Sequence, residues 1–170
     1  YNRLQNIFRV NQFTMQFRKI FTLFIILSYS LSVDAELLIE RFNPESLSQP
    51  VGYSQVVTIK GNHKYIYLGG KAGIYPDDSF PETLEEQSDL TFENIRMALA
   101  AAGASPKDVV DIEIYIVDLE DIDFETNPVY EDVRNFFPAG HKPTSMVIGI
   151  SALAYPGLLV EINVRAVVEE

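Results

Sequence analysis

The sequence predicts one domain that combines strands and helices, with two helices lying on one side of a β-sheet. Three observations lead to this prediction. The chain has 170 residues, a length that favours one compact domain with an appendage. From residue 36 onward, segments with the period of a strand alternate with segments with the period of a helix. In the last segment, Leu158 to Val168, alternate residues form one apolar face, as expected of a strand that packs against helices.

The expected strands cover residues 54–60, 65–70, 109–118, 144–151 and 158–168. Residues 36–50 are expected to be an irregular lead-in. Gly61-Asn62-His63-Lys64 separates the first two strands and predicts a β-hairpin there. Glycines, Pro76 and Asp77-Asp78 predict a loop over residues 69–80.

Two segments have the helical period. Over about residues 83–102, Phe92, Ile95, Leu99 and Ala102 form one stripe, and Gly103 is a C-terminal stop signal. The second helix is expected over about residues 127–137. Its inward residues should be Val129, Val133 and Phe136 or Phe137.

Strand parity predicts two unlike faces of the sheet. In the last strand, the face opposite the apolar one carries Leu159, Glu161, Asn163 and Arg165. In the strand over 144–151 we expect Met146, Ile148 and Ile150 on the apolar face, and small residues, Ser145 and Gly149 among them, on the other. This mixed second face suits a subunit interface or a pocket, with plain exposure to water as the alternative.

Composition excludes several classes of site. The chain has no Cys, so a thiol nucleophile, a thiolate metal site and a disulfide framework are excluded. Its two histidines, His63 and His141, are far apart in sequence, so we expect no metal. Residues 36–170 carry 9 Lys and Arg against 23 Asp and Glu, a formal charge of −14. This charge repels phosphate backbones, and we expect no nucleic-acid partner.

Residues 1–35 are predicted to lie outside the domain, which then covers 36–170. Arg18 and Lys19 precede the apolar segment Ile20 to Leu27, and Val33-Asp34-Ala35 resembles a cleavage site. This pattern predicts a signal peptide and a secreted or periplasmic protein without a stable membrane span after processing. A membrane anchor is the alternative, but the segment is shorter than the roughly 18 residues that a span needs. Residues 1–14 are interpreted as lying upstream of an initiator at Met15.

Six segments in one order and spacing, from about Pro44 to Val168, resemble the Rid family, the reactive intermediate deaminases of RidA/YjgF type. They are VGYSQVV, KYIYLGGKAG, EQSDLTFENIRMALAAAGASPKDVVDIEIYIVD, NPVYEDVRNFF, KPTSMVIGISAL and PGLLVEINVRAVV. The resemblance implies a chorismate-mutase-like α+β fold, with a mixed sheet backed by two helices. It also implies a homotrimer whose sheets line a central barrel and whose ligand clefts lie between subunits. Active members hydrolyse enamines and imines to keto acids and ammonia, without metal or cofactor.

The resemblance also implies a set of site residues. Tyr53 would flank the cleft, or be an ordinary aromatic at a strand end. Gly69 would let its backbone lie close to the ligand, or only end its strand. Asn127 would line the cleft, although its place before Pro128 favours a helix cap. Glu161 would be the catalytic carboxylate that orients water or relays a proton, or else a solvated strand residue.

The chain departs from the family's pattern at Ser145. Active deaminases have Pro-Ala-Arg there, and the arginine binds the substrate carboxylate in two hydrogen bonds. This chain has Pro143-Thr144-Ser145, and the nearby Lys142 should point away from the cleft. Two functions therefore stay open. One is a deaminase-like hydrolase of weak or altered specificity. The other is a non-catalytic homotrimer that binds a small molecule (an imine, an enamine or a small carboxylic acid) through Thr144, Ser145 and backbone groups.

Overall fold

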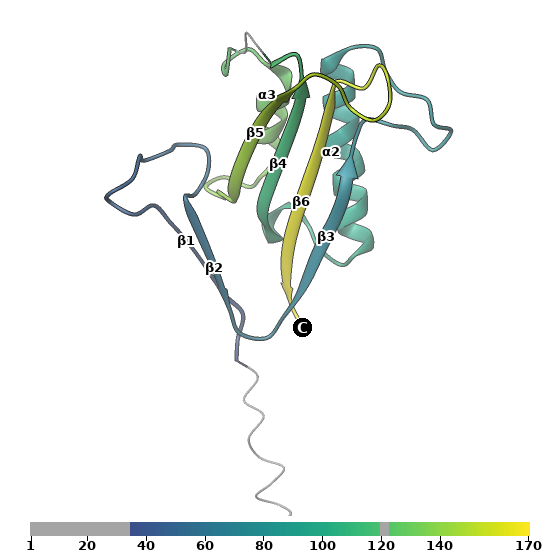
Figure 1. Ribbon diagram of the computed structural model, residues 1–170. Helices are drawn as coiled ribbons and strands as arrows, with labels where there is room; N and C mark the ends of the chain where they lie inside the picture. Colours follow the sequence, from purple (N-terminus) through teal and green to yellow (C-terminus); the bar gives the residue numbers. More distant parts are fainter. Residues whose placement is uncertain (1–34, 120–122) are drawn as a thin grey trace, which may run out of the picture. The chain divides into compact units, whose positions relative to one another are not determined.

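The computed structural model describes residues 35–119 and 123–170 (Figure 1). The elements in this part are β1 (Leu38–Phe42), β2 (Val56–Lys60), β3 (His63–Lys71), α2 (Leu84–Ala101), the 3₁₀ helix η1 (Pro106–Asp108), β4 (Val109–Val117), α3 (Pro128–Phe136), β5 (Thr144–Ile150) and β6 (Val160–Glu169). None of the helices in these two ranges is long and apolar enough to cross a bilayer. The predicted signal peptide lies almost wholly outside the described residues and stays a prediction.

Four of the strands form a mixed sheet in the order β3-β6-β4-β5. β6 pairs antiparallel with both β3 and β4, while β4 and β5 are parallel. Both helices lie on one face of this sheet (Figure 1). The predicted α+β fold, a mixed sheet backed by two helices, is therefore confirmed.

The core lies between this face and the helices. Alternate residues of the two central strands point into it and are at most 1% exposed, namely Ile112, Ile114, Ile116, Val160, Ile162, Val164 and Ala166. From α2, Phe92, Ile95 and Leu99 pack against them, as the helical stripe predicted. Each of the Val, Ile, Leu and Phe side chains among them contributes roughly 1.5–3 kcal/mol when fully buried. The apolar face predicted for the last strand is thus the one that holds the helices.

Both helices begin at side-chain caps. The Thr83 hydroxyl accepts a hydrogen bond from the Glu86 amide at 3.3 Å and donates to the Glu86 carboxylate at 2.9 Å. Asn127 Oδ1 accepts from the Val129 amide at 2.9 Å, with Pro128 as the first helical residue. These bonds satisfy amides that have no partner within the helix. Gly103, at φ +80°, follows the end of α2, where a left-handed residue is easiest for glycine.

The predicted hairpin between the first two strands is wrong. β2 pairs with β1, which forms within the segment expected to be irregular, and β3 pairs with β6. The backbone of Glu36 lies against Gly61, and the Asn62 amide donates to the Ala35 carbonyl at 2.8 Å. The amino-terminal segment therefore occupies the turn, and β1 supplies the hydrogen bonds that the hairpin partner would have supplied.

The facing of β5 also differs from the prediction. In the parallel pairing, Ser145, Val147 and Gly149 are in register with Ile112, Ile114 and Ile116 and share their helix-side face. Met146, expected toward the helices, is 44% exposed. A Cβ on Gly149 would lie 2.7 Å from that of Leu119, so the close approach of residue 119 requires the glycine. The register with β4 therefore decides which residues of this edge strand share the face of the helices.

Gln87 on α2 joins the helix to the segment that precedes β6. It is fully buried, and its amide donates to the carbonyls of Pro81 (2.8 Å) and Gly157 (2.9 Å) while its oxygen accepts from the Leu159 amide (2.8 Å). Gln87→Ala would leave three backbone groups without partners. We expect it to lower the free energy of unfolding by about 2 kcal/mol in urea titrations.

Gln49→Ala is the matched control for this prediction. The Gln49 amide also makes two hydrogen bonds to backbone carbonyls, at 3.0 and 2.9 Å, but it is exposed. Water can replace those bonds, so the change should stay within about 0.5 kcal/mol. Equal effects of the two substitutions would contradict the role assigned to burial at Gln87.

Candidate functional site

A cavity of about 770 Å³ lies between the loop before β2, helix α3 and the start of β5. Its lining is Val51, Gly52, Tyr53, Ile114, Phe124, Tyr130, Val133, Arg134, Phe137, Pro138, Ala139, Gly140, His141, Lys142, Ser145 and Val147. Cavities that bind small molecules have about 300–1,000 Å³ and a mostly apolar lining with few polar groups. This cavity meets both criteria.

Ser54 holds Tyr53 at the cavity. It is buried, its amide donates to the Pro143 carbonyl at 3.0 Å, and its hydroxyl donates to the Lys142 carbonyl at 2.7 Å. These two bonds join the loop before β2 to the residues that lead into β5. Tyr53 and Ser145, 92 positions apart in sequence, consequently line one cavity.

Helix α3 forms one wall. Its cap at Asn127 fixes where the helix begins, so that Val133 and Phe137 face the cavity while Val129 is fully buried beneath them. Phe124, just before the helix, packs on Tyr130 with ring centroids 4.8 Å apart. The capping role considered for Asn127 is confirmed. Asn127 itself is not among the lining residues.

His141 closes the end of the cavity next to β5. Its ring stacks on Phe137, with centroids 5.4 Å apart, and Nε2 lies 2.8 Å from the Val109 carbonyl. A carbonyl only accepts, so Nε2 carries the proton and the neutral ring leaves Nδ1 as an acceptor. Burial lowers the pKa of His141, against the opposing effect of that hydrogen bond. The ring is therefore neutral at pH 7.

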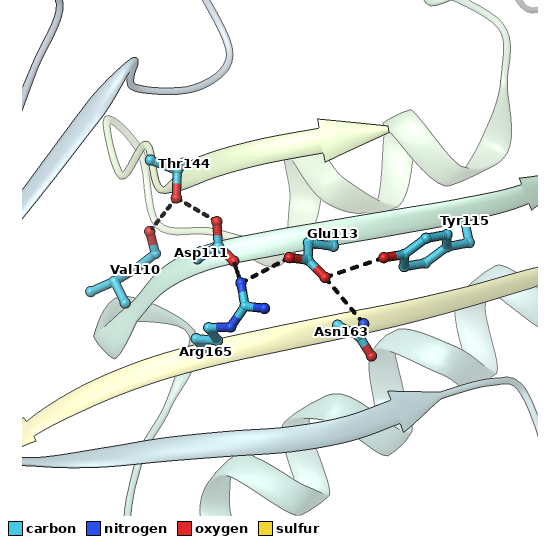
Figure 2. A network of polar contacts seen from close by, with 7 residues as sticks. All are labelled: Val110, Asp111, Glu113, Tyr115, Thr144, Asn163 and Arg165. Carbon is cyan, nitrogen blue, oxygen red and sulfur yellow. Dashed lines mark hydrogen bonds and ion pairs between the residues drawn. The ribbon is translucent and has the colours of Figure 1, made fainter. Parts of the chain in front are cut away.

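The opposite, open face of the sheet carries a polar network, shown in Figure 2. Arg165 pairs with Asp111 and, at 2.9 Å, with Glu113. Hydrogen bonds from Asn163 (3.2 Å) and then from Arg165 lower the pKa of Glu113. The Thr144 hydroxyl lies 2.5 Å from the Asp111 carboxylate, at one end of the network. Thr144 thus belongs to this face, whereas Ser145 belongs to the cavity.

Glu161 is also on the open face. It is in register with Tyr115 on β4, and its carboxylate lies against Gly70 on β3, where any Cβ would collide with it. A Cβ on Gly69 would meet no atom of the described chain within 4 Å. A side chain at Gly70 would therefore displace the end of the Glu161 side chain from its present position. Gly69 leaves its backbone accessible to another molecule.

Four of the six predicted site residues fall into two groups. Tyr53 and Ser145 meet in the cavity beside β5, at one edge of the sheet. Gly69 and Glu161 lie on β3 and its neighbour β6, toward the other edge. The expectation that Ser145, Gly149 and Glu161 share a face is wrong, because pairing with β4 turns Ser145 to the helix side. One copy of the chain does not bring Glu161 to the cavity.

Three polar lining residues were not expected from the sequence. One is Lys142, which was expected to point away from the cleft but belongs to the cavity lining. Arg134 comes from the outer side of α3, and His141 from the loop before β5. His141 could have been predicted as a site residue, because it stands only four residues before Ser145. Arg134 could not, because its sequence context is that of an ordinary surface residue. Within the ranges 35–119 and 123–170, no group of three His, Asp or Glu side chains is placed to hold a metal ion.

Comparison with known proteins agrees with the fold. The family model described as Endoribonuclease L-PSP matches residues 44–168. A RutC family protein of Pyrococcus abyssi is 31% identical over 121 residues, covering 65% of this chain and 92% of that protein. The 2-iminobutanoate/2-iminopropanoate deaminase of Dermatophagoides farinae is 29% identical over 108 residues, covering 62% and 78%.

Among solved structures, a conserved Rid family protein of unknown function from Yersinia pestis superposes with a TM-score of 0.67 at 25% identity. The match covers 75% of this chain and 97% of that one. The family model spans most of the chain, including every predicted site residue. The chain therefore belongs to the Rid family, the RidA/YjgF proteins whose family model is described as Endoribonuclease L-PSP.

Proposed function

We propose that the protein is a Rid-family hydrolase of enamines and imines, with weak or altered specificity, that acts at a cleft between subunits. The observation that carries the proposal is the cavity lined by Tyr53 and Ser145, at the position of the family's substrate-binding motif. The deaminase of Dermatophagoides farinae, a relative at 29% identity, supports the reaction class.

The reaction needs a water molecule and two proton transfers. Water adds to the carbon of the C=N bond, and the resulting carbinolamine expels its nitrogen as ammonia once that nitrogen is protonated, which leaves a carbonyl. A carboxylate near the nitrogen can take a proton from the attacking water and return one to the leaving nitrogen. Glu161 is the residue proposed for this role.

The separation of the two groups of site residues supports a trimer. Tyr53 and Ser145 lie beside β5, and Glu161 lies toward the β3 edge, so neighbouring copies in a closed ring could bring one group to the other. The open face also exposes apolar surface, with Tyr67 67% and Met146 44% exposed. We propose a homotrimer in which Glu161 of one copy completes the cavity of the next.

A subunit-mixing experiment tests this arrangement. Glu161→Gln removes the proposed acid–base group, and Ser145→Trp fills the cavity. Each variant alone should form a trimer, as measured by light scattering, but should release no ammonia. Trimers that contain both variants, isolated with two different tags, have one intact site if the site is shared. Ammonia release per trimer should then be about one third of the native value.

Failure of this experiment would be informative. Mixed trimers without activity would place the whole site in one subunit, and a native monomer at micromolar concentration would remove the shared cleft. If the native protein accelerates no imine in a panel, the second candidate holds: a trimer that binds a small molecule without turnover. The replacement of the family's arginine by Ser145 is the observation that favours this second candidate.

We do not propose RNA cleavage, despite the description of the family model. The formal charge of residues 36–170 is −14, from 9 basic and 23 acidic residues, and it opposes binding to a polyanion. A small ligand held in a cavity experiences mainly the groups that line the cavity.

A further inference from the structure

The cavity beside β5 is basic, in an acidic protein. Within one copy, its lining includes Arg134 and Lys142 but none of the Asp and Glu residues in the described ranges 35–119 and 123–170. About one residue in seven of the chain is acidic, so a lining of this size would include about two by chance. We propose that Arg134 on α3, assisted by Lys142, binds the carboxylate of an anionic ligand in this cavity.

Arg134 is available for this role. Within the described ranges, its one recorded hydrogen bond is a long one, 3.3 Å from Nη1 to the Phe124 carbonyl at the cavity rim. A guanidinium has five N–H donors in a planar fork that matches both oxygens of a carboxylate. The bond to Phe124 orients the side chain along the rim and leaves the rest of the fork for a ligand.

The polar residues of the lining other than Arg134 are positively charged or neutral, so none of them repels a carboxylate. Lys142 is half-buried beside the start of β5, and its ammonium is the second positive charge. His141 contributes a neutral ring, since burial lowers its pKa and Nε2 is committed to Val109. Ser145 is a small, neutral residue of the lining and leaves room for a ligand beside β5.

The remaining lining indicates the body of the ligand. Most of it is apolar or aromatic, from Val51, Ile114, Phe124, Val133, Phe137 and Val147. A cavity of about 770 Å³ is much larger than a three-carbon acid needs. The ligand class is therefore a monocarboxylate with an aromatic or large aliphatic body. An imino or keto acid of this class would be the substrate if the proposed hydrolase function holds, on which this part of the inference rests.

Calorimetric titration with a matched pair of probes tests the charge directly. Phenylacetate and phenylacetamide have the same body and differ in the carboxylate. We expect phenylacetate to bind the purified protein at least 5-fold more tightly at low salt, and the difference to shrink as salt is added. Arg134→Gln should weaken phenylacetate binding about 10-fold and leave phenylacetamide unchanged. Lys60→Gln, which removes an exposed cation on β2 outside the cavity, is the control and should change neither.

A rescue variant guards against misfolding as the explanation. In Arg134→Gln/Ser145→Arg, the new guanidinium enters the same cavity from β5, and phenylacetate binding should return to within about 3-fold of native. Equal binding of the two probes, or phenylacetate binding that Arg134→Gln does not alter, overturns the inference. These readouts need no turnover. Charge-dependent binding in a protein inactive on every imine would refute the hydrolase and leave the inference standing.

Discussion

Replacing Glu161 with glutamine should lower the rate of imine hydrolysis about 100-fold. The amide keeps the size of the side chain and its position over Gly70, but it cannot take a proton from water or return one to the leaving nitrogen. Removal of a general acid–base group costs about 10²–10⁴ in rate. The measurement is ammonia release from the imine that the native protein hydrolyses fastest. The loss should appear in kcat, with little change in KM.

The control for this prediction lies on the same strand. Glu169, the last residue of β6, is exposed and in register with His63, away from the cavity and from Gly70. Glu169→Gln should leave the rate within about 2-fold of native, as expected of a surface change. A native rate in Glu161→Gln would show that another group transfers the protons. His141, which lines the cavity and whose Nε2 is bonded to the Val109 carbonyl, would be the next residue to test.

Ser145→Arg should raise turnover of 2-iminopropionate or 2-aminoacrylate, generated in situ, by roughly 10- to 100-fold. Such small imino acids offer little apolar surface, so their affinity depends on the contact to the carboxylate. A bidentate guanidinium contact contributes about 1.5–3 kcal/mol in a partly desolvated site. Ser145 faces the cavity, which has room for the longer side chain. The native protein should show little activity on these two substrates.

Ser151→Arg is the matched control, since it adds the same charge just beyond β5 and outside the cavity lining. It should leave turnover unchanged. High native activity on 2-iminopropionate would show that a group already present holds the small carboxylate well. A correctly folded, trimeric Ser145→Arg protein without activity would remove the deaminase proposal and favour the binding function.

The sequence by itself determined the elements that local chemistry specifies. Both helices were predictable because their stripes and caps lie within a few residues, as at Asn127 and Gly103. The buried face of β6 was predictable because its alternation is unbroken over the whole strand. The resemblance to the Rid family rests on the order of short segments, which the sequence also carries.

Pairing between distant strands was decided only by the tertiary structure. Nothing in residues 54–70 distinguishes a hairpin from two strands with other partners. In the structure, the backbone of Glu36 lies against Gly61, and β1 is the strand that pairs with β2. The same holds for β5, where either face is plausible on composition. Its register with β4 turns Ser145 toward α3 and Thr144 toward Asp111. A shift of one residue exchanges the two faces of a strand, so the location of the cavity is a property of the register.

The basic character of the cavity likewise required the fold. Tyr53, Arg134, Lys142 and Ser145 come from a loop, a helix and the start of a strand. Arg134 is exposed and has no local motif, so its role follows only from which wall of the cavity α3 forms. Local sequence fixes caps and periodicity because those interactions are between near neighbours. Side chains that meet across the fold are brought together by strand pairing and helix packing, which no single segment encodes.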